Sequence, residues 1–173
     1  MAISWPAAPD TNAVLDACKS AMEGVTFNYT DGSKDLGGNY IITQRTLQRV
    51  TKGGLKDYTE STPLGVIRLF QGPTERHNFG GRVRNRLLVH LRFALSMIDA
   101  EAAEVNLAYF NDAFPPYFLQ HATLSGAHGV FNSRLDQESI RMGYVEVQRQ
   151  EYRVLEMLLE VNQEYQIPGG IIG

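Results

Sequence analysis

The stretch "RVRNRLLVHLRFALSM", residues 82–97, alternates between apolar and polar side chains. Positions of one parity are apolar except at Asn85: Val83, Leu87, Val89, Leu91, Phe93, Leu95 and Met97. Positions of the other parity are polar except at Leu88 and Ala94: Arg82, Arg84, Arg86, His90, Arg92 and Ser96. A period of two is typical of a strand with one face toward a core and the other toward water. We therefore predict a long strand here.

The stretch "YRVLEMLLEVNQEYQI", residues 152–167, has the composition of a helix, because Leu, Glu, Met and Gln are good helix formers. On a helix, however, its apolar side chains would point in nearly all directions. On a strand, one face is apolar except at Gln163: Leu155, Met157, Leu159, Val161, Tyr165 and Ile167. The opposite face is polar except at Leu158: Glu156, Glu160, Asn162, Glu164 and Gln166. Pattern outweighs intrinsic propensity, so we predict a second long strand over residues 155–167.

Two helices are predicted, one before the first long strand and one between the two long strands. The first begins at Asp10 or Thr11, which are good N-cap residues, and ends at Gly24. Its apolar stripe, with the spacing of one helix face, comprises Val14, Leu15, Cys18, Ala21 and Met22. We expect Cys18 to be a small buried apolar residue on that stripe. The second helix, over residues 100–114, is capped by Asp99 and is expected to end at Pro115-Pro116.

The remaining segments are predicted to be short strands, turns and loops. Residues 28–62 are rich in Gly, Thr, Lys and Asp, which predicts a long loop or hairpin that leaves the core as an arm. Within this excursion, "NYIITQRTLQRV" is interpreted as one strand or as part of a hairpin. Before the first long strand we expect a strand at 25–29, a short strand at 63–72 and a turn at 73–81. After the second helix we expect an added helical turn at 117–124 and a loop at 125–136. Residues 144–150 are expected to be a partner for the last strand or the start of that strand.

The length and composition indicate one globular domain. The chain has 173 residues, of which 43% are hydrophobic and 20% are charged. We predict a single α+β domain over residues 1–173, in which two α-helices pack on the apolar face of an antiparallel β-sheet. Residues 168–173 are expected to form a flexible C-terminal tail.

Charge and segment patterns exclude several classes of protein. The net charge of −3 argues against a general nucleic-acid binder, which is usually basic. The start "MAISWPAAPD" lacks the features of a signal peptide, and no apolar stretch approaches the ~18 residues of a membrane span. A lone cysteine, Cys18, excludes an internal disulfide. We therefore expect a soluble protein of a reducing compartment, with no membrane partner.

No motif in the chain encodes a reaction. GxSxG elbows, P-loops and dinucleotide fingerprints do not occur. His121 and His128 are seven residues apart with no cysteine nearby, which is a poor pattern for zinc. The carboxylates of Glu156 and Glu160 would be some 13 Å apart along a strand, too far for an acid/base pair. We expect no metal, no cofactor and no enzymatic activity.

Two oppositely charged stripes are the strongest candidates for a function. One follows the polar face of the first long strand, and the other follows the polar face of the last. They could be solvated faces, they could pair within one sheet, or they could pair across a subunit boundary. On the last interpretation the candidate subunit-interface residues are Arg82, Arg84, Arg86, Arg92, Glu156, Glu160 and Glu164.

The order of predicted elements resembles that of the tail terminator proteins of long-tailed bacteriophages, also described as tail-to-head joining or tail completion proteins. The stretches that carry the resemblance cover most of the chain in order and length: "DTNAVLDACKSAMEGVTF", "PLGVIRLFQG", "RVRNRLLVHLRFALSMIDAEAAEVNLAYF" and "GYVEVQRQEYRVLEMLLEVNQEYQI". The chain departs from compact family members in its long segments 28–62 and 115–136. Since the family has no catalytic or binding motif, no site residue is carried over.

The resemblance implies a structural virion protein in the tail or neck, assembled in the host cytoplasm. Its subunits would form a ring, most often a hexamer, that caps the finished tail tube, ends tube polymerisation and offers a surface to a neck or head-completion protein. Genomic DNA would pass through the ring without sequence-specific contact. A ring needs two different complementary patches on each subunit.

Two alternatives remain open from the sequence. A head–tail adaptor or minor tail component would bind a portal or head-completion ring instead of tube ends. A small enzyme or ligand-binding module around His121 and His128 would have a deep pocket with convergent polar groups.

Overall fold

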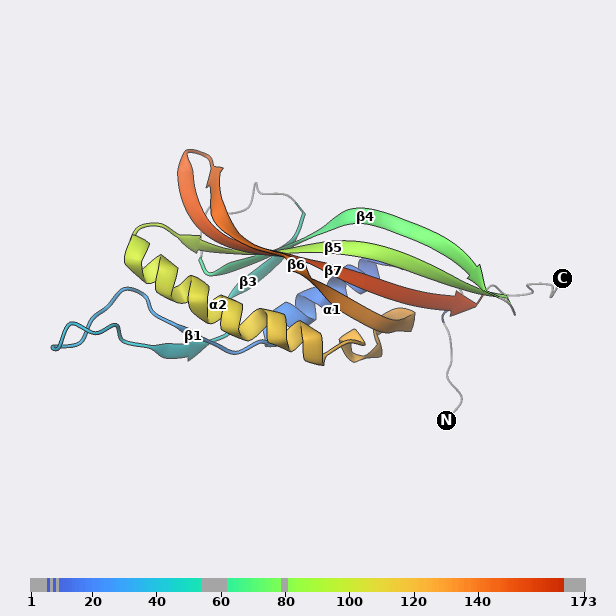
Figure 1. Ribbon diagram of the computed structural model, residues 1–173, viewed down its shortest axis with the longest axis horizontal. Helices are drawn as coiled ribbons and strands as arrows, with labels where there is room; N and C mark the ends of the chain where they lie inside the picture. The colour runs from blue at the N-terminus through green and yellow to red at the C-terminus, as the bar shows by residue number, and fades with distance from the viewer. Residues whose placement is uncertain (1–5, 7, 9, 54–61, 79–80, 167–173) are drawn as a thin grey trace.

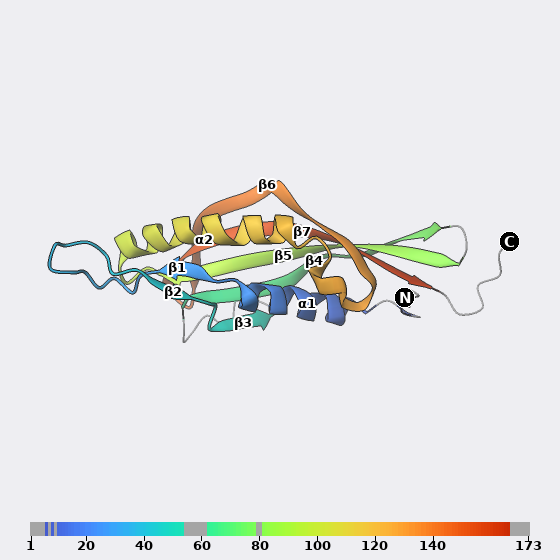
Figure 2. The same cartoon turned by 90° about the horizontal axis from the view of Figure 1, so that it is seen from below.

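The computed structural model describes residues 6, 8, 10–53, 62–78 and 81–166, and for residues 73–78 and 127 it describes the backbone alone. Within these ranges the protein has the predicted α+β fold. Two helices, α1 (Thr11–Gly24) and α2 (Ala100–Gln120), lie on one face of a five-stranded sheet (Figures 1 and 2). The predicted tail at 168–173 lies outside the described residues.

The five-stranded sheet has the order β3-β4-β5-β7-β6. Its strands are β3 (Arg49–Lys52), β4 (Leu64–Asn78), β5 (Arg82–Ser96), β6 (Val130–Val147) and β7 (Gln150–Gln166). Three of the four pairings are antiparallel, as predicted. The prediction of an antiparallel sheet is wrong for β3, which runs parallel to β4 because both strands begin at the same end, with Arg49 opposite Leu64.

Both decisive stretches are strands, as predicted, and they are neighbours in the sheet, although Ile167 of the second stretch lies outside the described residues. β5 and β7 pair without a break from Arg82 opposite Gln166 to Ser96 opposite Tyr152. In this register the apolar parity of each strand faces the helices. The two residues that interrupt the apolar pattern, Asn85 and Gln163, lie opposite each other and are both buried. Gln163 Nε2 donates a hydrogen bond to the carbonyl oxygen of His128 at 2.7 Å.

The excursion after the first helix contains two short strands that belong to different sheets. β2 (Thr43–Arg45) pairs with β1 (Phe27–Tyr29) in an antiparallel ladder, which agrees with the hairpin interpretation. β3 instead joins the edge of the main sheet. The stretch "NYIITQRTLQRV" is therefore not one strand.

β4 is longer than predicted, because residues 73–78 continue the strand instead of forming a turn. The pairing of β4 with β5 shifts register between Leu69 and Gln71 and again between Gln71 and Thr74, so Pro73 falls at an irregularity. β3 pairs with β4 only from Leu64 to Ile67. Proline is tolerated where a ladder is irregular or one edge is unpaired, since it has no N–H to donate.

The loop predicted at 125–136 is wrong. A 3₁₀ helix (Leu124–Gly129) is followed directly by β6. The buried side chains near the start of β6 are Val130, Ser133 and Leu135, and the register with β7 shifts between Val130 and Asn132. This shift interrupts the alternation of buried and exposed side chains, so the sequence pattern does not indicate a strand here. β6 ends at Val147, so residues 144–147 belong to the partner strand, and Gln148 and Arg149 form the turn with φ values of 52° and 66°.

The predicted end of the second helix at Pro115-Pro116 is also wrong, because α2 continues through both prolines to Gln120. Its fully buried side chains Phe110, Phe114 and Phe118 are spaced four residues apart and face the sheet. Their burial stabilises the helix beyond the prolines and outweighs the two backbone hydrogen bonds that the prolines cannot donate. The added helical turn at 117–124 is confirmed for residues 117–120.

The core between the helices and the sheet is dominated by aromatic rings. The ring of Phe93 on β5 lies 4.0 Å from that of Phe114, and the ring of Phe27 lies 4.7 Å from that of Phe110. α1 contributes its predicted stripe, in which Cys18 is fully buried, and burial raises the pKa of its thiol to about 12. Gly65 lets α1 lie close to β4, because a Cβ there would be 2.8 Å from Met22 Cε.

A second, smaller cluster explains the exception at Ala94. The end of the β6–β7 hairpin bends away from the helices (Figure 1). Val145 and Val147 from this hairpin pack against a buried group on the face of the sheet opposite the helices, which consists of Leu64, Val66, Ala94, Tyr152 and Val154. Ala94 lies on the otherwise polar face of β5 and is buried there because the hairpin covers it.

Replacing Phe114 by Ala tests the aromatic core. We expect Phe114→Ala to lower the free energy of unfolding by about 3–5 kcal/mol, because it removes a fully buried ring from between α2 and β5. Urea unfolding followed by circular dichroism measures the loss. The matched control is Leu119→Ala on the same helix, whose side chain is 48% exposed and whose loss should change stability by no more than about 0.5 kcal/mol. Equal losses in the two variants would contradict the placement of Phe114.

Candidate functional site

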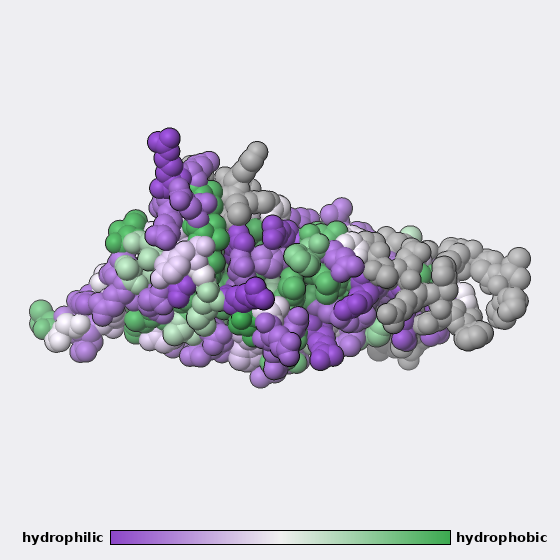
Figure 3. All heavy atoms as spheres, turned by 45° about the horizontal axis from the view of Figure 1, so that its top comes forward, coloured by the Kyte–Doolittle hydropathy of each residue, from purple (hydrophilic) through white to green (hydrophobic). Residues whose placement is uncertain are grey.

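The seven predicted interface residues all lie on the face of the sheet opposite the helices, here called the charged face. Arg84 is directly opposite Glu164 in the β5–β7 ladder, and Arg92 is directly opposite Glu156. Figure 3 shows this side of the molecule obliquely, with hydrophilic residues over much of the surface and hydrophobic residues in several smaller groups. The structure therefore brings the arginine and glutamate stripes together on neighbouring strands.

The two stripes form ion pairs within one sheet. Arg86 Nη2 lies 2.7 Å from Glu160 Oε2. Arg82 and Arg84 share the buried carboxylate of Glu164, at 3.8 and 3.7 Å. Of the interpretations left open by the sequence, pairing within one sheet holds in this chain. Half-exposed pairs of this kind contribute little stability, about 0–1 kcal/mol each. A role in a subunit interface stays a prediction.

The most buried part of the charged face is a cluster around Glu156. Arg68 Nε donates a hydrogen bond to His90 Nδ1 at 3.0 Å, and since arginine cannot accept, the His90 proton is on Nε2. That nitrogen lies 3.8 Å from Glu156 Oε2, and the Arg92 guanidinium pairs with the other carboxylate oxygen. The interactions of Glu156 with His90 and Arg92 outweigh the opposing effect of burial and lower its pKa from 4.5 to about 2.

The second candidate feature is a projecting segment, residues 30–42, here called the arm. It leaves the core beside the start of α2 and extends beyond it (Figures 1 and 2). The arm is a small hairpin, with a bridge between Lys34 and Tyr40 and a hydrogen bond from the Ile41 N–H to the Ser33 carbonyl at 2.9 Å. At its tip, Asp35 Oδ1 accepts from the N–H groups of Gly37 and Asn39 at 2.8 and 2.9 Å. These bonds lower the pKa of Asp35, that from Asn39 foremost.

The arm tip presents an apolar side chain to solvent. Leu36 is fully exposed, and Ile41 and Ile42 are partly exposed on the same segment. Three large apolar side chains are thus exposed on one short segment, and exposed apolar residues that lie together mark interaction sites more often than isolated ones do. The tip is therefore a candidate contact for another molecule.

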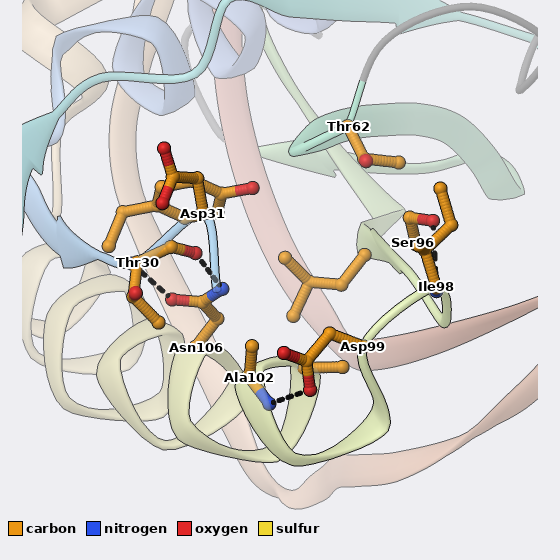
Figure 4. Close-up of a pocket in the computed structure, with 11 residues that line it drawn as sticks. Thr30, Asp31, Thr62, Ser96, Ile98, Asp99, Ala102 and Asn106 are labelled. Atoms are coloured by element: carbon orange, nitrogen blue, oxygen red, sulfur yellow. Dashed lines mark hydrogen bonds between the residues drawn. The ribbon is translucent and has the colours of Figure 1, made fainter. Parts of the chain in front are cut away.

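A buried asparagine fixes the base of the arm to α2 (Figure 4). Asn106 Oδ1 accepts from the Thr30 N–H at 2.8 Å, and Asn106 Nδ2 donates to the Thr30 carbonyl oxygen at 2.8 Å. Both residues are almost completely buried. Lys34 adds a surface contact, 3.4 Å from Glu101 Oε2. The sequence analysis missed Asn106, although a polar residue on the buried side of an amphipathic helix is a signal for such an anchor.

A pocket of 210 Å³ lies beside this anchor (Figure 4). The two carboxylates that line this pocket both accept hydrogen bonds from nearby backbone N–H groups. Asp99 Oδ1 accepts from the Ala102 N–H at the start of α2, and Asp31 Oδ1 accepts from the Ser33 N–H, which lowers the pKa of Asp31. The residues that line the pocket therefore have a structural role at the junction between the arm and α2.

The histidines of the alternative enzyme hypothesis lie in ordinary surface environments. His121 stacks on the ring of Tyr117, and its Nδ1 lies 2.8 Å from the Tyr117 carbonyl oxygen. His128 Nε2 lies 3.2 Å from the Ala8 carbonyl oxygen. In the described part of the chain, no three or more His, Cys, Asp or Glu side chains are grouped so that they could hold a metal ion. Within the same ranges, no helix has the length and apolar character needed to cross a membrane.

Comparison with known proteins adds no assignment. A scan against protein-family models gives no match, and a search of curated proteins gives no match either.

The arm anchor can be tested by substitution of Asn106. We expect Asn106→Ala to lower the free energy of unfolding by about 1–3 kcal/mol, because the Thr30 N–H and carbonyl groups stay buried without a partner. Hydrogen exchange should become faster across the arm. The control is Asn28→Ala, an exposed position on β1. Unchanged exchange in the arm of the Asn106 variant would contradict the role of this residue.

The Glu156 cluster predicts a pH dependence. Because the folded state lowers the pKa of Glu156 from 4.5 to about 2, the stabilisation is complete above about pH 4.5 and is lost as the pH falls toward 2. Glu156→Gln should therefore be less stable than the native chain at pH 7, by about 1–3 kcal/mol, since Arg92 loses its charged partner. The difference should disappear between pH 4.5 and 2.

Urea unfolding at a series of pH values measures this difference. Glu146→Gln, at an exposed position on β6, is the control and should behave like the native chain. A stability difference between Glu156→Gln and the native chain that stays constant from pH 7 to 2 would rule out the proposed ion pairing.

Proposed function

We propose that this chain is a structural subunit that assembles into a ring, caps the tail tube of a long-tailed bacteriophage and joins the tail to the head. The observation that carries the proposal is the arm. It projects from the core, its turn is already hydrogen-bonded, and it exposes Leu36 at its tip. Such a segment suits a protein whose partner is another protein surface, because preorganisation lowers the entropy lost on binding.

The open sheet supports an assembly role as well. The helices cover one face, while the charged face carries half-exposed arginines from Arg82 to Arg86. A polar, charged surface of this kind can adjoin other protein surfaces without exposing a large apolar area, which would promote non-specific association of the free subunit. The junction pocket beside Asn106 favours an enzyme less, since both of its carboxylates already accept hydrogen bonds from nearby backbone N–H groups.

The step from an assembly protein to a tail terminator rests on the resemblance in element order. The partners it implies are further copies of this chain in a ring, most often a hexamer, the tail tube protein, and a neck or head-completion protein. Genomic DNA would pass through the hole without sequence-specific contact. The ring would reside in the virion, at the junction of tail and neck, after assembly in the host cytoplasm.

Mixing experiments with polymerising tail tube protein test the proposal. We expect the purified chain to form closed rings by native mass spectrometry, to sit at one end of each tube in electron micrographs, and to shorten the tubes as its concentration rises. Unfolded chain at the same concentration is the control. A chain that stays monomeric at all concentrations and never associates with tube ends would contradict the proposal.

The same experiment distinguishes a tail terminator from the second candidate, a head–tail adaptor. A head–tail adaptor would bind a portal or head-completion ring and leave tube length unchanged. Pull-downs with tube protein and with portal protein, run in parallel, distinguish the two roles.

A further inference from the structure

Three polar side chains interrupt the buried face of the sheet near the start of β6: Asn85 on β5, Gln163 on β7 and Ser133 on β6. Each is at most 4% exposed. Their side-chain oxygens, Asn85 Oδ1, Gln163 Oε1 and Ser133 Oγ, are closed off from solvent and have no hydrogen-bond partner among the described residues. Leaving a buried polar atom unsatisfied is costly, so each of these atoms requires an explanation.

The strand register brings the three side chains together. Asn85 is directly opposite Gln163 in the β5–β7 ladder, and Ser133 is opposite Val161, two residues before Gln163, in the β6–β7 ladder. Opposite and diagonal side chains on one face of neighbouring strands are within reach of each other. This face packs against the helices, since Val161 belongs to the main hydrophobic core. The three side chains therefore form one polar cluster in the core, contributed by three strands.

The cluster does not satisfy its own oxygens. Gln163 Nε2 donates to the His128 carbonyl oxygen at 2.7 Å, and this bond fixes the orientation of the amide, because a reversed amide would put two oxygens against each other. Gln163 Oε1 therefore needs a donor from elsewhere, and Asn85 Oδ1 needs one as well. The hydroxyl of Ser133 has one hydrogen, so it can donate to only one of these two amide oxygens.

One water molecule has the matching set of hydrogen-bonding groups. It can donate to both amide oxygens and accept from the Ser133 hydroxyl, and buried waters typically make about three hydrogen bonds. A metal cation would also be attracted by oxygens, but all three side chains are neutral, and a buried charge without a counter-charge is unfavourable. The ladder is irregular at this point, because the register of β6 with β7 shifts between Val130 and Asn132. Such a shift disrupts the regular strand pairing locally.

We propose that Asn85, Gln163 and Ser133 bind one internal water molecule that bridges β5, β7 and β6. The water donates hydrogen bonds to Asn85 Oδ1 and Gln163 Oε1 and accepts one from Ser133 Oγ. It thereby holds the start of β6 in place next to its register shift. This inference goes beyond the proposed function and does not depend on assembly into a ring.

A high-resolution crystal structure of the native chain tests the site directly. We expect an ordered water within about 3 Å of all three oxygens. A direct hydrogen bond between the Asn85 and Gln163 amides, with no electron density between the three side chains, would overturn the proposal. An anomalous peak at this position in crystals grown with rubidium chloride would identify a cation site instead and would also overturn it.

Magnetic relaxation dispersion of the solvent ¹⁷O nuclei counts long-lived internal waters in solution. Asn85→Leu replaces the amide by an apolar side chain of similar size, and we expect it to lower the count by one relative to the native chain. Asn132→Leu makes the same change at an exposed position on β6 and should leave the count unchanged. The same count in the native chain and in Asn85→Leu would contradict the site.

Ser133→Ala provides a milder test that also serves if Asn85→Leu does not fold. It removes only the hydroxyl, so we expect the residence time of the water to shorten at least about tenfold through the loss of one of its three hydrogen bonds. Ser20→Ala, at an exposed position on α1, is the matched control. An unchanged residence time in Ser133→Ala would show that β6 takes no part, and the proposed three-strand bridge would be wrong.

Discussion

The register of β5 against β7 determines most of what this protein presents to its surroundings. Along most of the ladder from Arg82–Gln166 to Ser96–Tyr152, apolar residues are opposite apolar residues and polar residues are opposite polar ones. The exceptions include Leu88–Glu160, His90–Leu158 and Leu95–Arg153. A slip of one residue would turn every side chain of one strand to the other face. The same register puts Phe93 and its neighbours under the helices and aligns the arginines of one strand with the glutamates of the other. In the same register, the two buried polar residues Asn85 and Gln163 lie opposite each other.

Because these charges satisfy each other within the sheet, they are weak candidates for a partner's main contact. An arginine that already holds a carboxylate gains little from a second one, and breaking the first pair to reach it costs desolvation. Specific association then depends on groups that lack a partner in the chain. Leu36 on the arm is such a group. The charged face is thus a polar surround, and an exposed apolar side chain is the better candidate for the source of affinity in an assembly.

Local periodicity predicted the parts of the fold that repeat regularly: β5, β7, the stripe of α1 with buried Cys18, and the capped start of α2. It failed where a non-local effect decides the outcome. α2 continues through Pro115 because of packing by phenylalanines against a distant strand. The start of β6 lost its alternation to a register shift. The turn at Gln148-Arg149 carries no glycine or asparagine signal. The seven charged residues were identified, but their pairing depends on which strands are neighbours, and the anchor at Asn106 depends on a backbone group 76 residues away.

The arm carries the last step of the argument, because its order changes the energetics of assembly. A disordered excursion would lose its conformational entropy only on binding and would weaken the contact accordingly. Here the entropy of residues 30–42 is already lost on folding, through the Asn106 anchor and the hydrogen bonds of the Asp35 turn. A single apolar side chain at the tip can then act as an anchor despite its small area. The buried asparagine on α2 thereby fixes the position of the arm that carries the tip.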